Sequence, residues 1–175
     1  MPIEYDICIV DVDNQTMDVQ CGNGFNKQFK VSTAENGVGN ESGSFKTPLG
    51  KHSVCEKIGD GAPILTIFKS RQDTGFTCKT LNVPVDEDLI LTRILRLKGE
   101  ESGVNSGHKE DGTCIDSYER YIYIHGTNRE DLLGTPASHG CIRMGNDDIV
   151  ELFPNIRVGA TVDMRSSKAT LRPSV

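Results

Sequence analysis

The feature that most constrains the fold is a series of short segments in which apolar and polar residues alternate, separated by turns rich in glycine and proline. Such alternation places the apolar side chains on one face of a β-strand. Residues 5–12 and 16–21 show it on either side of Asp13-Asn14-Gln15, which predicts a hairpin with a short loop. Further strands are predicted at residues 27–34, 51–58, 63–70, 89–97, 120–126 and 159–165. The pattern predicts a mostly β fold.

One segment has the periodicity of a helix. Residues 146–153 begin with Asn146, a favourable N-cap residue, followed by two aspartates in the first turn, where the helix dipole favours acids. Pro154 is expected to end the helix. The predicted apolar face holds Ile149, Val150 and Phe153. We therefore expect one or two short helices beside the strands.

Length and charge narrow the functional classes. The 175 residues predict a single domain, residues 1–175, that can bury a core without disulfides. The net charge is −6, and the 19 Lys and Arg residues are scattered, which argues against a nucleic-acid partner. There is no apolar run near the roughly 18 residues of a membrane span. The N-terminus has no signal-peptide pattern, so a cytoplasmic location is expected. If a signal peptide has been removed, the alternative is the periplasm or the cell wall.

The segment with the most reactive side chains is HGTNREDLLGTPASHGCIRMG, residues 125–145. His125 is expected to end a strand, on the face opposite its aliphatic neighbours. The same period applied to residues 138–144 places His139, Cys141 and Arg143 on one face. A base, a thiol and a cation would then lie side by side. A neighbouring imidazole can lower the pKa of a cysteine thiol, and a glycine next to it leaves N–H groups free to face an oxyanion.

Less reactive roles are expected for the other cysteines and histidines. A single cysteine is usually an inert, partly buried residue, and this interpretation is given to Cys8, Cys21, Cys55, Cys78 and Cys114. His52 and His108 are interpreted as surface or structural residues. There is no C-x-x-C pair, so a zinc knuckle or a thioredoxin-like pair is not expected.

Metal binding is the main alternative for the reactive segment. His125, His139 and Cys141 could supply a His₂Cys ligand set for zinc or copper. The nearby Arg143 would place a second positive charge beside the ion. The sequence therefore favours a nucleophile, with no metal and no cofactor.

These residues resemble the signature of the L,D-transpeptidase catalytic domain, the YkuD family. That signature has a histidine and glycine at a strand end, then about a dozen residues, then Ser/Thr-His-Gly-Cys. Here 12 residues separate His125 from Ser138. Residues 31–54 are similar to the family's Ser-Thr-Gly and Thr-Pro-x-Gly stretch, with Ala34 where glycine is usual, and residues 159–164 resemble its closing strand. The resemblance implies a β-sandwich or barrel.

The resemblance also implies roles for individual residues. Cys141 would be the nucleophile and His125 its general base, oriented by the backbone around Gly126. The N–H groups of His139, Gly140 and Cys141 would form the oxyanion hole. Arg143 would bind or position a substrate carboxylate, or else make a surface ion pair. Ser138 would shape the loop by hydrogen bonding.

The implied reaction is acyl transfer on peptidoglycan stem tetrapeptides or soluble muropeptides, with release of the terminal D-alanine. Water as acceptor gives an L,D-carboxypeptidase, which we expect, as a cytoplasmic enzyme of cell-wall recycling. The alternative is an exported L,D-transpeptidase that forms 3→3 cross-links or exchanges D-amino acids. Carbapenem β-lactams are expected inhibitors. The polar loop at residues 99–119 is expected to cap the acceptor side. A domain of this fold that binds wall peptides without turnover is a further alternative.

Overall fold

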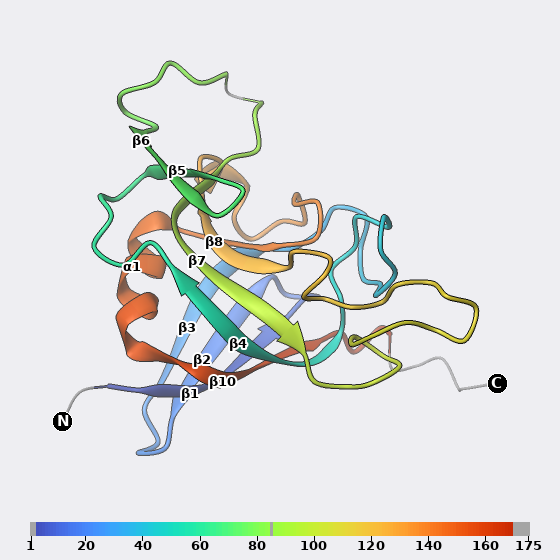
Figure 1. Ribbon diagram of the computed structural model, residues 1–175. Helices are drawn as coiled ribbons and strands as arrows, with labels where there is room; N and C mark the ends of the chain where they lie inside the picture. The colour runs from blue at the N-terminus through green and yellow to red at the C-terminus, as the bar shows by residue number, and fades with distance from the viewer. Residues whose placement is uncertain (1–2, 85, 170–175) are drawn as a thin grey trace.

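The computed structural model describes residues 3–84 and 86–169. Its strands form one sheet in the order β4-β10-β1-β2-β3-β9-β8-β7-β5-β6, and β4 also pairs with β7. This extra pairing closes the sheet into a barrel, from which β5 and β6 extend as a hairpin (Figure 1). Closure pairs the barrel edges that an open sheet would expose. The mostly β barrel expected from the sequence is confirmed.

The strands are β1 (Tyr5–Asp11), β2 (Thr16–Cys21), β3 (Asn26–Ser32), β4 (Gly50–Ile58), β5 (Thr66–Lys69), β6 (Gln72–Thr77), β7 (Ile90–Gly99), β8 (Tyr123–Thr127), β9 (Ile142–Met144) and β10 (Ile156–Arg165). The hairpin of β1 and β2 and the other expected strands are present. Strand β6 was not predicted, because its sequence QDTGFT is mostly polar and contains a glycine. Strand β8 begins three residues later than expected.

The barrel interior is filled by the apolar faces of the strands. In β1 and β2, Cys8, Val10, Met17 and Val19 are fully buried, as alternation predicts. Tyr5 is buried out of phase, because the pairing register of β1 shifts between Tyr5 and Ile7. Such a shift moves the following side chains to the opposite face. Burial raises the pKa of the Cys8 thiol to about 12, which makes this cysteine inert.

Helix α1 (Asn146–Asn155) packs against β7 and β8 (Figure 1), and the short 3₁₀ helix η1 (Glu130–Leu132) precedes it. Three expectations for α1 were wrong. Gly145 is the N-cap residue and Asn146 is the first helical residue. Pro154 lies in the last turn rather than after it, because a proline there removes only one helical hydrogen bond. Val150 is exposed, and Leu152 takes its place on the buried face.

Asn146 instead connects the helix to the barrel. Its buried side chain accepts a hydrogen bond from Thr92 Oγ1 (2.6 Å) and donates to the Thr127 carbonyl oxygen (2.8 Å) and Glu130 Oε1 (2.9 Å). Gly126 passes so close to this side chain that a Cβ there would lie 2.4 Å from Asn146 Oδ1. The end of β8 therefore requires glycine at this position.

Beyond Gly99, the last residue of β7, the loop at residues 99–119 has no helix or named strand but is firmly attached. Buried Asn105 donates to the carbonyl oxygens of Leu49 and Lys51 at 3.1 and 3.0 Å. His52 is also buried, and its Nε2 lies 2.8 Å from Ser117 Oγ. His52 is therefore a structural residue, as expected. Three residues separate the end of the loop from β8, so its anchoring fixes the approach to that strand.

We expect Asn146→Ala to lower the free energy of unfolding by about 2–4 kcal/mol, because it removes the acceptor of the buried Thr92 hydroxyl and a donor to the buried Thr127 carbonyl oxygen. Urea unfolding followed by circular dichroism measures this. The control is Asn155→Ala on the same helix, which removes one exposed hydrogen bond and should cost less than about 1 kcal/mol. Equal costs would show that Asn146 does not connect helix and barrel.

Candidate active site

The candidate site is built by two neighbouring parallel strands. Strands β8 and β9 pair with His125 opposite Arg143, and Cys141 directly precedes β9. Tyr123 and His125 alternate onto one face of β8. Tyr123 packs in the same apolar cluster as Cys141, so His125 and Cys141 share that face. The charges of Asp88 and Arg143 influence the pKa values of both groups.

His125 is held in one orientation by its own strand. Its ring is buried, and Nδ1 lies 2.6 Å from the Gly126 carbonyl oxygen. A carbonyl oxygen can only accept, so Nδ1 carries the proton and Nε2 keeps a free lone pair. Burial lowers the pKa of His125 below its ordinary value. The imidazole is thus a neutral proton acceptor at neutral pH.

Cys141 differs from the sequence expectation of an acidified thiol. Burial raises the pKa of the Cys141 thiol to about 11. Its Sγ contacts backbone atoms, accepting from Tyr123 N and donating to the Tyr121 carbonyl oxygen, each at 3.4 Å. It packs in one cluster with Phe68, Ile94 and Tyr123, which leaves the side chain half-buried. The free protein therefore holds a neutral thiol beside a neutral imidazole.

The loop before Cys141 is shaped by Ser138. Its Oγ donates to the Cys141 carbonyl oxygen (2.6 Å) and accepts from Gly140 N (3.2 Å). Gly140 has a φ of +134°, which other residues rarely adopt. Because the Gly140 N–H is already used, the expected set of three oxyanion donors is reduced. The N–H groups of His139 and Cys141 are the two that have no acceptor among the described residues.

Arg143 and His139 both contact one carboxylate that the sequence did not single out. Asp88 Oδ1 lies 2.8 Å from Arg143 Nη2, and Asp88 Oδ2 lies 3.1 Å from His139 Nδ1. Arg143 therefore makes an ion pair, but its side chain is only 4% exposed, so the pair is buried on the arginine side rather than at the surface. Its Nε is buried and has no hydrogen-bond partner in the part of the chain that the structure describes.

Asp88 was missed because nothing in the sequence distinguishes it. It is the last of three acids in VPVDED, in the irregular segment between β6 and β7. Only the folded chain shows that this carboxylate pairs with both flanks of the Cys141 segment. A search of the sequence for acidic residues just before a strand would also have selected Asp86 and Glu87, so it could not have distinguished Asp88.

The alternative His₂Cys metal set is not assembled. His125 is buried on β8, whereas His139 is exposed and directed to Asp88. The three side chains do not form a cluster of ligand atoms among residues 3–84 and 86–169. All six cysteines are free thiols.

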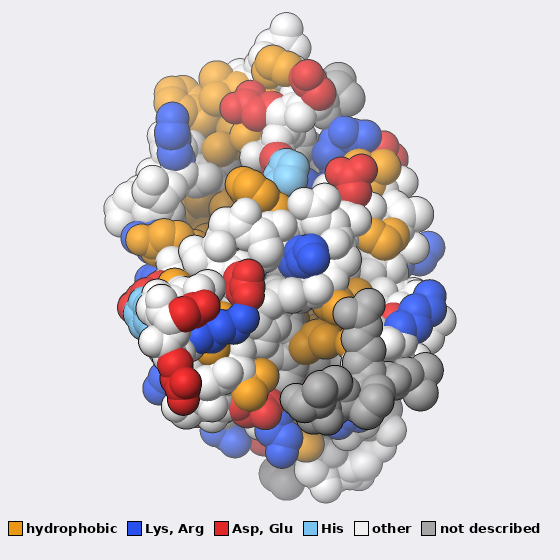
Figure 2. Space-filling view, turned by 90° about the vertical axis from the view of Figure 1, so that its right-hand side faces the viewer, with side chains coloured by type: hydrophobic (Ala, Val, Ile, Leu, Met, Phe, Trp, Pro, Cys, Tyr) orange, Lys and Arg blue, Asp and Glu red, His pale blue; other side chains and the backbone are white. Residues whose placement is uncertain are grey.

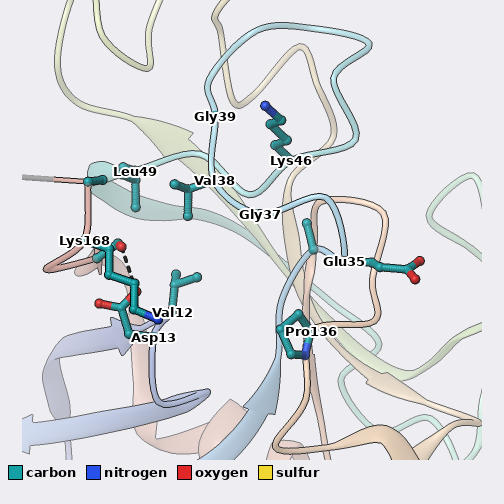
Figure 3. A pocket seen from close by; sticks show the side chains of 13 residues that line it. Val12, Asp13, Glu35, Gly37, Val38, Gly39, Lys46, Leu49, Pro136 and Lys168 are labelled. Atoms are coloured by element: carbon teal, nitrogen blue, oxygen red, sulfur yellow. Dashed lines mark hydrogen bonds between the residues drawn. The ribbon is translucent and has the colours of Figure 1, made fainter. Parts of the chain in front are cut away.

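A pocket of about 640 Å³ lies elsewhere, at the ends of β1 and β3. Figure 3 shows Val12, Val38 and Leu49 around it, with the Glu35 carboxylate directed away. Neither His125 nor Cys141 lines this pocket, so we do not assign the chemistry to it.

On the face that Figure 2 shows, basic and acidic side chains are interspersed. No helix of the described residues has the length and apolar character needed to cross a membrane.

We expect Asp88→Asn to speed alkylation of Cys141 by iodoacetamide about two- to five-fold at pH 8.5, because the Asp88 charge raises the pKa of this thiol. Peptide mass spectrometry of the native protein measures the rate at each cysteine. In the unsubstituted protein, Cys141 should react at least about 10-fold more slowly than a small free thiol. The control is Asp86→Asn, the same change of charge in the same exposed segment, which should leave the rate unchanged. A slower or unchanged rate in Asp88→Asn would contradict the assigned geometry.

Comparison with known proteins places this site in a family. The sequence model of the YkuD family, the L,D-transpeptidase catalytic domain, matches residues 5–164. A Bacillus subtilis (strain 168) protein named "Putative L,D-transpeptidase YqjB" is 59% identical over 43 residues, which are 25% of this chain and 24% of that protein.

Solved structures show the same fold at low identity. The chain superposes on L,D-transpeptidase 3 from Mycobacterium tuberculosis, in complex with a faropenem-derived adduct, with a TM-score of 0.55 and 16% identity over 92% of this chain and 60% of that one. The LD transpeptidase LdtMt1 in complex with imipenem gives a TM-score of 0.53 and 15% identity over 92% and 59%. The chain thus covers less than two thirds of the proteins it matches. The match over residues 5–164 shows that the chain belongs to the YkuD family of L,D-transpeptidase catalytic domains.

Proposed function

We propose that this chain is a cysteine-dependent acyl-transfer enzyme that acts on peptidoglycan stem tetrapeptides and releases the terminal D-alanine. The observation that supports this most is the placement of Cys141 and His125 on one face of adjacent strands. The fixed Nδ1–H of His125 leaves Nε2 as the proton acceptor. A domain that only binds wall peptides would need neither group.

In the first step, Cys141 Sγ attacks the carbonyl carbon of the third stem residue. Because the thiol and the imidazole are both neutral, the S–H proton passes to His125 Nε2 as the S–C bond forms. For this transfer the thiol turns from the Tyr121 carbonyl oxygen, its acceptor in the free protein. The C–N bond to D-alanine then breaks, and the proton on Nε2 moves to the leaving amine. A thioester on Cys141 remains.

Backbone and side-chain donors bind the substrate around this sulfur. The N–H groups of His139 and Cys141 stabilise the oxyanion, each contributing roughly 3 kcal/mol by analogy with known donors. Arg143 Nε, which has no partner in the described chain, donates to a carboxylate oxygen of the substrate. Asp88 holds the other end of this guanidinium in place.

Water is the proposed acceptor, which makes the chain an L,D-carboxypeptidase that trims tetrapeptides to tripeptides. Water gives a proton to His125 Nε2 as its oxygen attacks the thioester carbonyl; the C–S bond then breaks, the tripeptide leaves as its carboxylic acid, and the proton on Nε2 returns to the sulfur. This choice is supported by the half-buried position of Cys141, bordered by Tyr121, two residues after the 99–119 loop, and by the segment that carries Asp88. The free cysteines are consistent with a reducing compartment, so we place the reaction in the cytoplasm, on soluble muropeptides.

The second candidate is L,D-transpeptidation, in which the amine of another stem peptide or a D-amino acid replaces water. The family match and the names of the relatives favour it. Either acceptor uses the same acyl-enzyme. We further propose that carbapenem β-lactams acylate Cys141, since two proteins of this fold are described with imipenem or a faropenem-derived adduct.

Incubation with free tetrapeptide and with disaccharide tetrapeptide, followed by mass spectrometry, tests the reaction. Tripeptide and D-alanine are expected, with no cross-linked dimer. Cys141→Ser should lower the rate by at least about 1,000-fold, because the nucleophile is lost. Cys78→Ser, a change at a half-buried thiol outside the site, should retain activity. Dimers would instead support transpeptidation, and an unchanged tetrapeptide would refute both reactions.

The pH dependence of kcat/KM tests the assigned base. Activity requires neutral His125, and burial lowers its pKa, so the acid limb should have its midpoint below pH 6.5. Activity is thus retained above this pKa and lost as the pH falls through it. His139→Gln, whatever its effect on the rate, should leave the midpoint in place. A midpoint above pH 6.5, or a limb that disappears in His139→Gln, would exclude His125 as the base.

A further inference from the structure

A second group of reactive side chains lies on the 99–119 loop, outside the proposed active site. His108, Cys114 and Glu119 each direct one potential ligand atom to a common point, and these atoms lie within 4.8 Å of one another. This is the one such cluster of three among residues 3–84 and 86–169. Its nitrogen, sulfur and oxygen donors are the ligand types that zinc accepts.

We propose that His108, Cys114 and Glu119 form a surface binding site for a divalent ion of the zinc type. Cys114 Sγ lies 3.3 Å from Glu119 Oε2, and His108 Nε2 lies 3.8 Å from the same oxygen. Tetrahedral zinc with a Zn–S bond of about 2.3 Å and Zn–N or Zn–O bonds of about 2.0–2.1 Å separates its ligand atoms by about 3.3–3.5 Å. The cluster therefore needs only small side-chain shifts to coordinate the ion.

The backbone holds the ligands together without the ion. His108 and Cys114 are paired across an antiparallel β-bridge, and Lys109 N donates to the Thr113 carbonyl oxygen at 2.9 Å. Glu119 is positioned by a hydrogen bond from its N–H to Asp116 Oδ1 at 3.0 Å. The loop itself is attached to the barrel through Asn105. Folding thus already brings the three ligands together, which lowers the entropic cost of binding an ion.

Charge and exposure also suit a cation. Residues 108–119 contain four acidic residues and one lysine, and the lysine is paired with Glu41. His108 and Glu119 are about half exposed, so an ion can enter from solvent and a water molecule can complete the coordination. Three protein ligands at a surface predict moderate affinity rather than a permanent structural ion.

The proposed zinc site is close in sequence to a segment that borders the proposed active site. Zinc binding does not require the active-site chemistry. Glu119 directly precedes Arg120, whose guanidinium donates to the carbonyl oxygens of Gly39 and Lys46. Tyr121, the next residue, accepts the hydrogen bond from Cys141 Sγ. An ion on Glu119 would therefore stiffen the segment that borders the sulfur. Binding itself is measured without any reference to peptidoglycan.

Zinc binding in a Cys141→Ala background tests the proposal, because this substitution removes the thiol of the proposed active site. Isothermal titration with zinc chloride should give one site per chain, with Co²⁺ in its place producing a thiolate charge-transfer band. Adding His108→Ala or Cys114→Ser should weaken binding at least about 10-fold. The matched control is Glu110→Gln, an exposed acid on the same turn that is outside the cluster.

A second readout covers the case of a variant that does not fold. In the Cys141→Ala protein, zinc should protect Cys114 from iodoacetamide, and EDTA should remove the protection. Cys78, which is outside the cluster, should react at the same rate with and without zinc. Zinc binding that is equal in all folded variants, or Cys114 alkylation that is indifferent to zinc, would overturn the proposal.

Discussion

The parallel pairing of β8 with β9 is the interaction on which the proposed chemistry depends. It joins two strands separated by a crossover of 14 residues and sets His125 opposite Arg143, two residues after Cys141. Barrel closure between β4 and β7 holds this pair within a ring of strands. The pairing requires glycine at position 126, where any side chain would meet Asn146 and the Leu91 carbonyl oxygen. The packing of the helix and the geometry of the site are therefore coupled.

Burial determines the protonation states of the Cys141 thiol and the His125 imidazole. A sulfur in contact with water could lose its proton to the histidine before substrate arrives, and would then be open to oxidation and alkylation. Around Cys141, apolar side chains penalise the thiolate, and burial of His125 penalises the imidazolium. Both groups remain neutral, and the energetic cost of charge separation falls on the reaction step. Donors placed for the oxyanion then act where the charge develops.

Two irregular segments give the site its borders. The segment between β6 and β7 brings Asp88 to Arg143 and His139. The 99–119 loop, attached through Asn105, is followed two residues later by Tyr121, whose carbonyl oxygen accepts the hydrogen bond from Cys141. Neither segment has helix or strand periodicity, yet each provides a group that contacts the reactive residues. Their positions come from polar contacts with the barrel.

The sequence by itself determined the period-two strands, the hairpin of β1 and β2, and the residues of the reactive segment, because alternation and local spacing are properties of neighbouring residues. The sequence also identified the helix, but it wrongly gave Asn146 the N-cap position. The side chain of Asn146 instead forms hydrogen bonds with three segments that are distant in sequence. Only the tertiary structure decided that Cys141 is a neutral thiol, that Gly140 N–H is occupied by Ser138, and that Asp88 joins the site. Protonation and pairing depend on burial and on groups from remote strands, and no local pattern records them.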